Sequence, residues 1–195
     1  MGRAELAQLQ AAIRACTRCV AAGHLKRAFP IIDGRITDRI MVIGQAPGEI
    51  ELTTGLPFSG RAGAELGRWL AVARVSPLPY RTSVTKCFPG KAPGGGAGDR
   101  RPSPREVALC ASWLQAELAI VRPRIVLLIG GLAISRFWGK GALAQIVGRS
   151  RLDGERLLIP LPHPSGASRW LNDLSHRLLL ARALRVLRKA AAALD

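Results

Sequence analysis

The 195-residue sequence has no apolar run of the roughly 18 residues that a membrane-spanning helix needs. Its longest run, residues 125–134, is about half that length and contains two glycines. The N-terminus is amphipathic and lacks the apolar core of a signal peptide. We therefore expect a cytoplasmic protein that contacts no membrane.

Acidic residues are few: 13 Asp and Glu oppose 29 Lys and Arg, which gives a net charge of +16. Such a charge attracts polyanions and favours DNA or RNA as a partner, so we expect the chain to associate with the nucleoid. The alternative is a general enrichment in surface arginine, because Arg outnumbers Lys. The length fits a single domain, residues 1–195, which we expect to be a monomer.

Cysteine is scarce, and without a secretion signal its four residues do not predict a disulfide framework. Cys16 and Cys19 form a CxxC that ends an N-terminal helical stretch, whereas a redox CxxC usually opens a helix after a strand. With Cys87 and Cys110 they could bind zinc or an iron–sulfur cluster, although the spacing does not fit a zinc ribbon. The alternative is buried free cysteines and a coincidental CxxC.

Short apolar runs alternate with helical patterns, which predicts an α/β fold: a three-layer α/β/α sandwich with a central, mainly parallel four-stranded sheet. The expected strands are residues 39–44, 81–85, 124–129 and 156–161. The expected helices are 3–15, 62–75, 104–121, a short one after 131, and 172–193. Loops 45–60, 86–104 and 162–170 follow strand ends and should converge on a ligand site. Residues 88–104 are expected to form a flexible basic loop.

The first of these loops, with its flanking residues 44–63, reads GQAPGEIELTTGLPFSGRAG. Its glycines let the backbone approach a ligand, Glu49 and Glu51 supply carboxylates, and Phe58 offers an aromatic face to a flat base. It matches neither a Walker loop nor a dinucleotide-binding fingerprint. Phe58 could equally belong to the core, and the two glutamates could be solvated.

The last loop contains His163 between two prolines, in the sequence LPHPSGAS. Because prolines on both sides restrict the backbone, the imidazole is directed, and it can donate a hydrogen bond to developing negative charge. The residues that follow, Ser165, Gly166 and Ser168, can bind phosphate. A purely structural histidine is the alternative.

These motifs together resemble the uracil-DNA glycosylase superfamily in its family 4 form. GQAPGEIELTTGLPFSGRAG is similar to the family's first motif, LPHPSG to its second, and SVTKC to its TN-x-xKC strand end. The four cysteines stand in the order of that family's iron–sulfur ligands. The resemblance extends from about Cys16 to Arg169, which is nearly the whole chain.

The resemblance implies a monofunctional DNA-repair glycosylase that flips uracil out of DNA, hydrolyses its N-glycosidic bond and leaves an abasic site. Phe58 would stack on the uracil, Glu51 would orient or activate water, and His163 would stabilise the leaving anion. The other implied substrate contacts are Gln45, Ala46, Gly48 and Ser83. The implied DNA contacts are Ser165, Gly166, Ser168 and Arg169. Cys16, Cys19, Cys87 and Cys110 would bind a 4Fe–4S cluster.

Three departures from the family pattern matter. Gln45 replaces a Glu, which moves the expected catalytic role to Glu51. Ser83 replaces the Asn that reads uracil, which allows a broadened specificity for deaminated bases. The loop after Cys87 has no histidine to trap the product, so turnover is expected. Its Lys91, Arg100 and Arg101 are expected to contact DNA, with a solvated loop as the alternative.

Two other functions stay open at this point. One is a catalytically degenerate iron–sulfur module that binds DNA or uracil, which Gln45 and Ser83 favour. The other is a zinc-stabilised nucleic-acid-binding domain without a base pocket.

Overall fold

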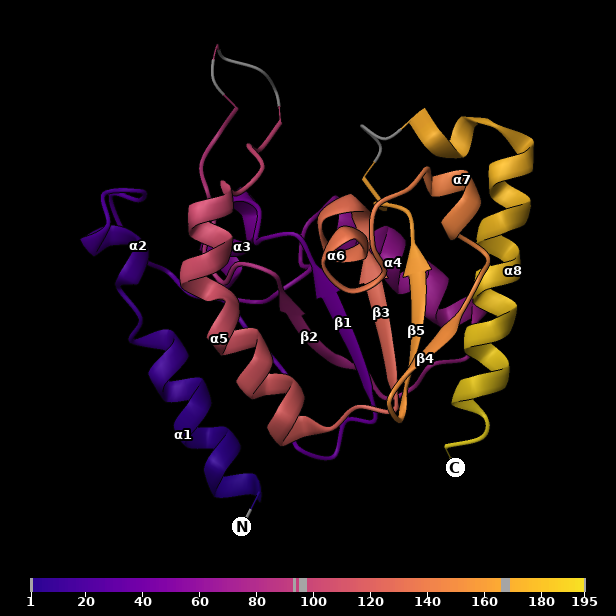
Figure 1. Ribbon diagram of the computed structural model, residues 1–195, viewed down its shortest axis with the longest axis horizontal. Helices are drawn as coiled ribbons and strands as arrows, with labels where there is room; N and C mark the ends of the chain where they lie inside the picture. Colours follow the sequence, from indigo (N-terminus) through magenta and orange to yellow (C-terminus); the bar gives the residue numbers. More distant parts are fainter. Residues whose placement is uncertain (1, 93, 95–97, 166–168, 195) are drawn as a thin grey trace.

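A computed structural model describes residues 2–92, 94, 98–165 and 169–194 (Figure 1). The helices are α1 (Gly2–Arg14), α2 (Arg18–Ala21), α3 (Glu49–Thr54), α4 (Arg61–Val72), α5 (Pro104–Val121), α6 (Gly130–Phe137), α7 (Leu143–Ile146) and α8 (Leu174–Ala191). The strands are β1 (Ile40–Gly44), β2 (Tyr80–Ser83), β3 (Ile125–Ile129), β4 (Arg151–Asp153) and β5 (Arg156–Leu161). A 3₁₀ turn, Arg169–Asn172, precedes α8. No helix in these described ranges is both long and apolar enough to cross a membrane.

The five strands form one sheet in the order β2-β1-β3-β5-β4, of which the first four run parallel. Every residue of β1 and β3 is buried, which is why these strands read as unbroken apolar runs in the sequence. The chain moves outward from β1 to β2 on one side and from β3 to β5 on the other. The switch point therefore lies between β1 and β3, where ligands bind in sheets of this kind.

Helices cover both faces of the sheet, so the predicted three-layer α/β/α architecture is confirmed (Figure 1). On one face α4 and α8 pack against alternate residues of β1, β3 and β5. On the other face α1, α5 and α6 pack against the remaining strand residues. Each layer has its own apolar core, and the sheet separates the two.

Several short elements were not predicted from the sequence: strand β4 and the helices α2, α3 and α7. The sheet has five strands instead of four, because the short, exposed Arg151–Asp153 pairs antiparallel with β5 across a turn at Gly154. Because all three residues of this strand are exposed, it lacks the apolar run by which a strand is recognised in a sequence. The predicted loop 45–60 contains helix α3, which begins after Gly48 and ends at Gly55 in the left-handed conformation. Its six residues are too few for a helical apolar period.

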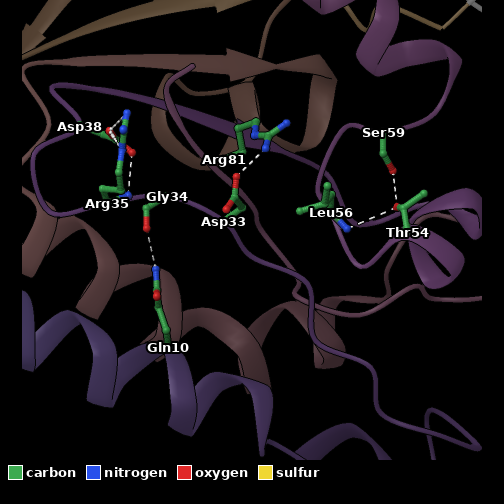
Figure 2. Close-up of polar contacts among 9 residues, drawn as sticks. All are labelled: Gln10, Asp33, Gly34, Arg35, Asp38, Thr54, Leu56, Ser59 and Arg81. Carbon is green, nitrogen blue, oxygen red and sulfur yellow. Dashed lines mark hydrogen bonds and ion pairs between the residues drawn. The ribbon is translucent and has the colours of Figure 1, made fainter. Parts of the chain in front are cut away.

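Helix α1 is tied to the edge of the sheet through the segment that leads to β1 (Figure 2). Gln10 donates from Nε2 to the carbonyl oxygen of Gly34 at 3.0 Å, and Asp33 forms an ion pair with Arg81 of β2. Gly34 lies so close to Tyr80 that a Cβ would meet its ring at 2.2 Å. The N-terminal helix, with the two cysteines that follow it, is thereby fixed relative to β2.

A charged pair is buried beside β2. Lys86 Nζ lies 2.5 Å from Glu117 Oε2 of α5, and the side chains are 2% and 0% exposed. The ammonium also donates to Thr82 Oγ1 at 2.7 Å and to the Ser83 carbonyl oxygen at 2.8 Å. Tyr80 donates its hydroxyl proton to the other oxygen of Glu117 at 3.0 Å. All three protons of the ammonium thus have acceptors, which is what a buried charge requires.

Removing one partner of this pair should be costly. We expect Glu117→Ala to lower the free energy of unfolding by about 3–5 kcal/mol, because Lys86 is left as a buried, unpaired charge. The measurement is urea unfolding followed by circular dichroism. In the double variant Lys86→Met/Glu117→Leu both charges are gone, so it should be more stable than Glu117→Ala. Glu155→Ala, in an exposed pair with Arg124, is the control and should cost less than about 1 kcal/mol. Equal losses in the two single variants would contradict the assignment.

Candidate nucleotide pocket and cysteine cavity

One pocket lies at the carboxyl ends of the parallel strands. Its walls include Gly44 at the end of β1, Ser83 at the end of β2, Ile129 at the end of β3, and His163 after β5. The site therefore forms at the switch point of the sheet. The same walls include residues predicted for several roles: the substrate contacts Gln45, Ala46, Gly48 and Phe58, the catalytic Glu51, and the DNA contacts Ser165, Lys91 and Arg100.

Phe58 is held in a constrained position at this pocket. Its ring packs against Gly44, where a Cβ would meet the ring at 2.7 Å, and it also touches the apolar core beneath α4 and α8. Its backbone is left-handed, with φ 55°, and a Cβ at Gly63 would lie 1.7 Å from its carbonyl oxygen. The two sequence interpretations of Phe58 are thus both partly right: the ring is half-buried and still forms part of the pocket wall.

The turn that leads to Phe58 is closed by Thr54 at the end of α3 (Figure 2). Thr54 Oγ1 accepts the N–H of Leu56 at 3.3 Å and shares a hydrogen bond of 2.5 Å with the hydroxyl of Ser59. These contacts bring the chain back from α3 toward α4. Because they involve Leu56 and Ser59, which lie on either side of Phe58, these contacts constrain how Phe58 approaches the pocket.

Glu51 binds backbone amides on both sides of α3. One carboxylate oxygen accepts the N–H of Gly48 at 3.0 Å, and the other accepts those of Ser59 and Gly60 at 3.2 and 3.4 Å. Since the carboxylate joins the start of the loop to its end, it holds the loop around the pocket. Glu51 is half-buried and part of the pocket wall, so a structural role accompanies the catalytic role that the sequence predicts.

Asp99 brings a further carboxylate to the pocket, one that was not expected from the sequence. A Cβ at Gly48 would meet Asp99 Oδ2 at 3.0 Å and Glu51 Oε2 at 2.9 Å, so both carboxylates approach the same glycine. Lys91 bridges Asp99 Oδ1 at 3.2 Å and Glu49 Oε2 at 2.6 Å. The sequence feature that could have indicated this role is the acidic residue itself, which lies within residues 88–104, expected only to be a flexible basic loop.

His163 faces the pocket from the opposite wall. The N–H of Ser165 donates to its Nδ1 at 3.2 Å, and the Ser165 hydroxyl lies 2.9 Å from the same nitrogen. The residue is exposed at the pocket mouth, and burial of part of the ring lowers its pKa. The lowered pKa favours the neutral imidazole, and because Nδ1 accepts a hydrogen bond from the Ser165 N–H, the ring proton lies on Nε2, which is the available donor. Gly130, with φ 79°, permits the close approach of the ring.

The residues predicted to contact DNA have different surroundings. Arg100 makes two hydrogen bonds of 2.7 Å to Glu106, which lower the pKa of that carboxyl to about 2. Lys91 has the two acidic partners named above, whereas Arg101 and Arg169 are exposed. Gly166 and Ser168 lie outside the described residues. DNA contact by this set remains a prediction, and the two paired cations have less charge free for phosphate.

The four cysteines line a second, smaller cavity on the other side of the segment that follows β2. Cys16 follows α1, Cys19 lies in α2, Cys87 follows β2 and Cys110 lies in α5, and none forms a disulfide. Burial raises the pKa of the Cys19 thiol to about 11 and that of Cys87 to about 12, and neighbouring cysteines add to both increases. Three segments distant in sequence therefore bring the four sulfur atoms within mutual electrostatic reach.

Two of these sulfurs already accept hydrogen bonds. The N–H of Lys86 donates to Cys110 Sγ and Trp113 Nε1–H donates to Cys16 Sγ, both at 3.3 Å. Among the residues that the structure describes, no three His, Cys, Asp or Glu side chains are grouped tightly enough to hold a single metal ion. A cluster of several irons is wider than one ion, and its ligands stand correspondingly further apart.

Comparison with known proteins agrees with this arrangement. The family model described as the uracil DNA glycosylase superfamily matches residues 32–188. This chain belongs to the uracil-DNA glycosylase superfamily. It is 33% identical over 175 residues to the type-4 uracil-DNA glycosylase of Thermotoga maritima, covering 86% of this chain and 85% of that one.

Other relatives belong to two branches of the superfamily. The type-4 uracil-DNA glycosylase of Pyrobaculum aerophilum is 30% identical over 146 residues, covering 74% of this chain and 67% of the relative. The type-5 uracil-DNA glycosylase of Thermus thermophilus is 31% identical over 164 residues, covering 69% and 71%. The family 4 resemblance inferred from the motifs is confirmed.

Two glycines of α4 offer a matched test of how the superfamily pocket holds Phe58. Gly63→Ala should displace Phe58, because the new Cβ would overlap its carbonyl oxygen, and should cost about 1–3 kcal/mol of stability. In Gly67→Ala the new Cβ has no neighbouring atom within 4 Å, so the higher helix propensity of alanine should raise the free energy of unfolding by about 0.5–1 kcal/mol. The measurement is urea unfolding, with release of uracil from an oligonucleotide, the reaction that names the superfamily, assayed alongside. Similar behaviour of the two variants would refute this account of Phe58.

Proposed function

We propose that this chain hydrolyses the N-glycosidic bond of uracil in DNA and leaves an abasic site, as a monofunctional DNA-repair glycosylase. The observation that carries the proposal is the convergence of Phe58, His163, Glu51 and Asp99 on one pocket at the sheet's switch point. A base within a duplex is inaccessible, so it must first be flipped into this pocket at a cost of a few kcal/mol. The chain acts as a monomer, and its positive charge attracts the DNA.

The chemistry separates charge between the base and the sugar. As the bond breaks, negative charge gathers on the uracil and positive charge on the deoxyribose. Phe58 stacks on the base, and the Nε2–H of neutral His163 donates to the uracil oxygen that becomes negative. Ser165 supports this role, because its N–H fixes the proton of His163 on Nε2.

The carboxylates act at the sugar side of the bond. Glu51 holds the loop through three amides and keeps its remaining lone pairs for water, while Asp99 reaches the same glycine, Gly48. Either carboxylate can orient the attacking water and stabilise the positive sugar. Gln45, which is uncharged, can orient but cannot accept the proton.

Ser83 determines how strictly the pocket reads the base. Its hydroxyl faces Gly44 and lines the pocket where the family pattern has an asparagine amide. A hydroxyl can donate or accept, whereas an amide presents both in a fixed geometry. The proposed specificity is therefore broader than uracil alone and includes other deaminated bases.

We further propose that Cys16, Cys19, Cys87 and Cys110 bind a 4Fe–4S cluster that joins α1 and α2 to the sheet. The donor set fits: four thiols line one cavity, two of them accept N–H hydrogen bonds, and Thr85 Oγ1 is a buried hydroxyl with no partner among the described residues. The bound cluster supplies positive iron charge that keeps buried thiols deprotonated. The chain's residues hold it and position the segment from Ser83 to Cys87.

Excision from labelled oligonucleotides tests the activity. Strands carrying one uracil opposite A, opposite G, or unpaired are incubated with the protein and then treated with alkali, which cuts abasic sites. We expect cleavage only after alkali, and cleavage at hypoxanthine or xanthine if Ser83 relaxes base reading. No release of any base from folded, cluster-loaded protein would favour the degenerate binding module instead.

Single substitutions assign the roles. His163→Ala should slow single-turnover excision by about two to three orders of magnitude, because the leaving anion loses its donor, while DNA binding is retained. Glu51→Gln and Asp99→Asn identify the water-activating carboxylate, since only its loss should flatten the acid limb of the pH–rate profile. Glu155→Gln, on the exposed β4–β5 turn, is the control. Full activity in the His163 and both carboxylate variants would refute the site.

The cluster proposal predicts an inorganic composition. Protein purified without oxygen should contain iron and acid-labile sulfide in equal amounts and absorb broadly in the visible range. Colourless protein containing zinc would instead support the zinc-stabilised domain. Replacing Cys110 with Ser should lower both the bound iron and the melting temperature, because α5 loses its link to α1 and α2.

A further inference from the structure

Thr85 is the one residue at the cysteine cavity whose buried polar side-chain atom lacks a hydrogen-bond partner in the described part of the chain. It is 4% exposed and follows β2 by two residues. A buried hydroxyl without a hydrogen-bond partner lowers stability by about 1–3 kcal/mol. We therefore expect that a bound group, rather than an atom of the protein, accepts a hydrogen bond from Thr85. The other neutral residues around the cavity are mainly apolar: Leu25, Ala28, Pro30 and Leu109.

The backbone fixes which way Thr85 is presented. Its N–H donates to the carbonyl oxygen of Gln45 at 3.2 Å, which joins it to the loop of the nucleotide pocket. Residues on either side are also fixed: the Val84 N–H donates to Gly44 at 2.9 Å, and Lys86 is held by its buried ion pair. The backbone of Thr85 is therefore held in place, and the residue lines the same cavity as the four sulfurs.

We propose that the Thr85 hydroxyl donates a hydrogen bond to a sulfur of the cluster or of one of its cysteine ligands, and so tunes the cluster's reduction potential and its retention. The inference rests on the proposed 4Fe–4S site. It adds a third donor to the two N–H groups that already reach Cys110 and Cys16. Hydrogen bonds to cluster sulfurs stabilise the more negative, reduced state and thereby raise the potential.

Two variants isolate the hydroxyl: Thr85→Val is isosteric and removes it, whereas Thr85→Ser keeps it and removes the methyl group. The full-length protein and both variants are purified without oxygen, analysed for iron and sulfide, and titrated with a reductant while the cluster is followed by visible absorbance and electron paramagnetic resonance. We expect Thr85→Val to shift the potential to more negative values and to lose iron faster in air. Thr85→Ser should restore both, and Thr37→Val, at an exposed turn, should change neither.

The outcomes separate the two proposals. Wild-type protein without iron and sulfide overturns the cluster and this inference together. A loaded Thr85→Val protein with the wild-type potential leaves the cluster standing and overturns the hydrogen bond, and the buried hydroxyl is then met by water. If Thr85→Val fails to retain iron, retention by Thr85→Ser supports the inference and its failure in both variants overturns it.

Discussion

The buried ion pair between Lys86 and Glu117 is the interaction on which both sites depend. It holds the short segment that leaves β2, because the ammonium also binds the carbonyl oxygen of Ser83 and the hydroxyl of Thr82. Ser83 lines the nucleotide pocket, while Cys87, one residue after the lysine, lines the cysteine cavity. A charge buried without a partner is costly, so this segment has one strongly preferred arrangement.

The two cavities consequently share a wall. A second charged link crosses it, since Arg100 lines the nucleotide pocket and Glu106, its bidentate partner, lines the cysteine cavity. Any change at the cysteines that moves α5 therefore acts on Arg100 and on Ser83 through rigid, paired groups. This gives a physical reason for the proposed cluster, which would lie away from the reacting bond: it would anchor the wall on which the base is proposed to be read.

The sequence predicted the features whose signal is local or repeats along the chain. Buried parallel strands are apolar runs, and the expected helix 104–121 coincides with α5, which Ser103 and Glu106 cap, so these boundaries agree closely with the structure. The motif residues Glu51, Phe58 and His163 were expected to converge, and they line one pocket. Helix α3 and strand β4 were missed because neither has a repeating pattern of apolar residues. Helix α3 is held by the hydrogen bonds of Glu51, and β4 forms only by pairing with β5.

Charge pairing was beyond the reach of the sequence for a different reason. In the sequence of a basic chain, a buried, paired lysine such as Lys86 looks the same as a solvated or DNA-binding lysine. Its role is apparent only when its partner, Glu117, 31 residues away, is known. Lys86, Lys91 and Arg100 all have acidic partners that fold topology brings to them. The excess of arginine predicts attraction to DNA, and it does not identify which cations are free to make the contact.

The pocket does not share the positive excess of the whole chain. The protein carries +16, yet the pocket walls set three carboxylates, Glu49, Glu51 and Asp99, beside three cations, Arg61, Lys91 and Arg100. Because Lys91 and Arg100 are held by acidic partners, the walls offer little free positive charge to phosphate, and under the proposed function a neutral base is the part that would enter. In the proposed reaction the base would meet the His163 donor, and the positive sugar left behind would face the carboxylates. The two kinds of group that line one pocket would thus match the two charges that the proposed reaction creates.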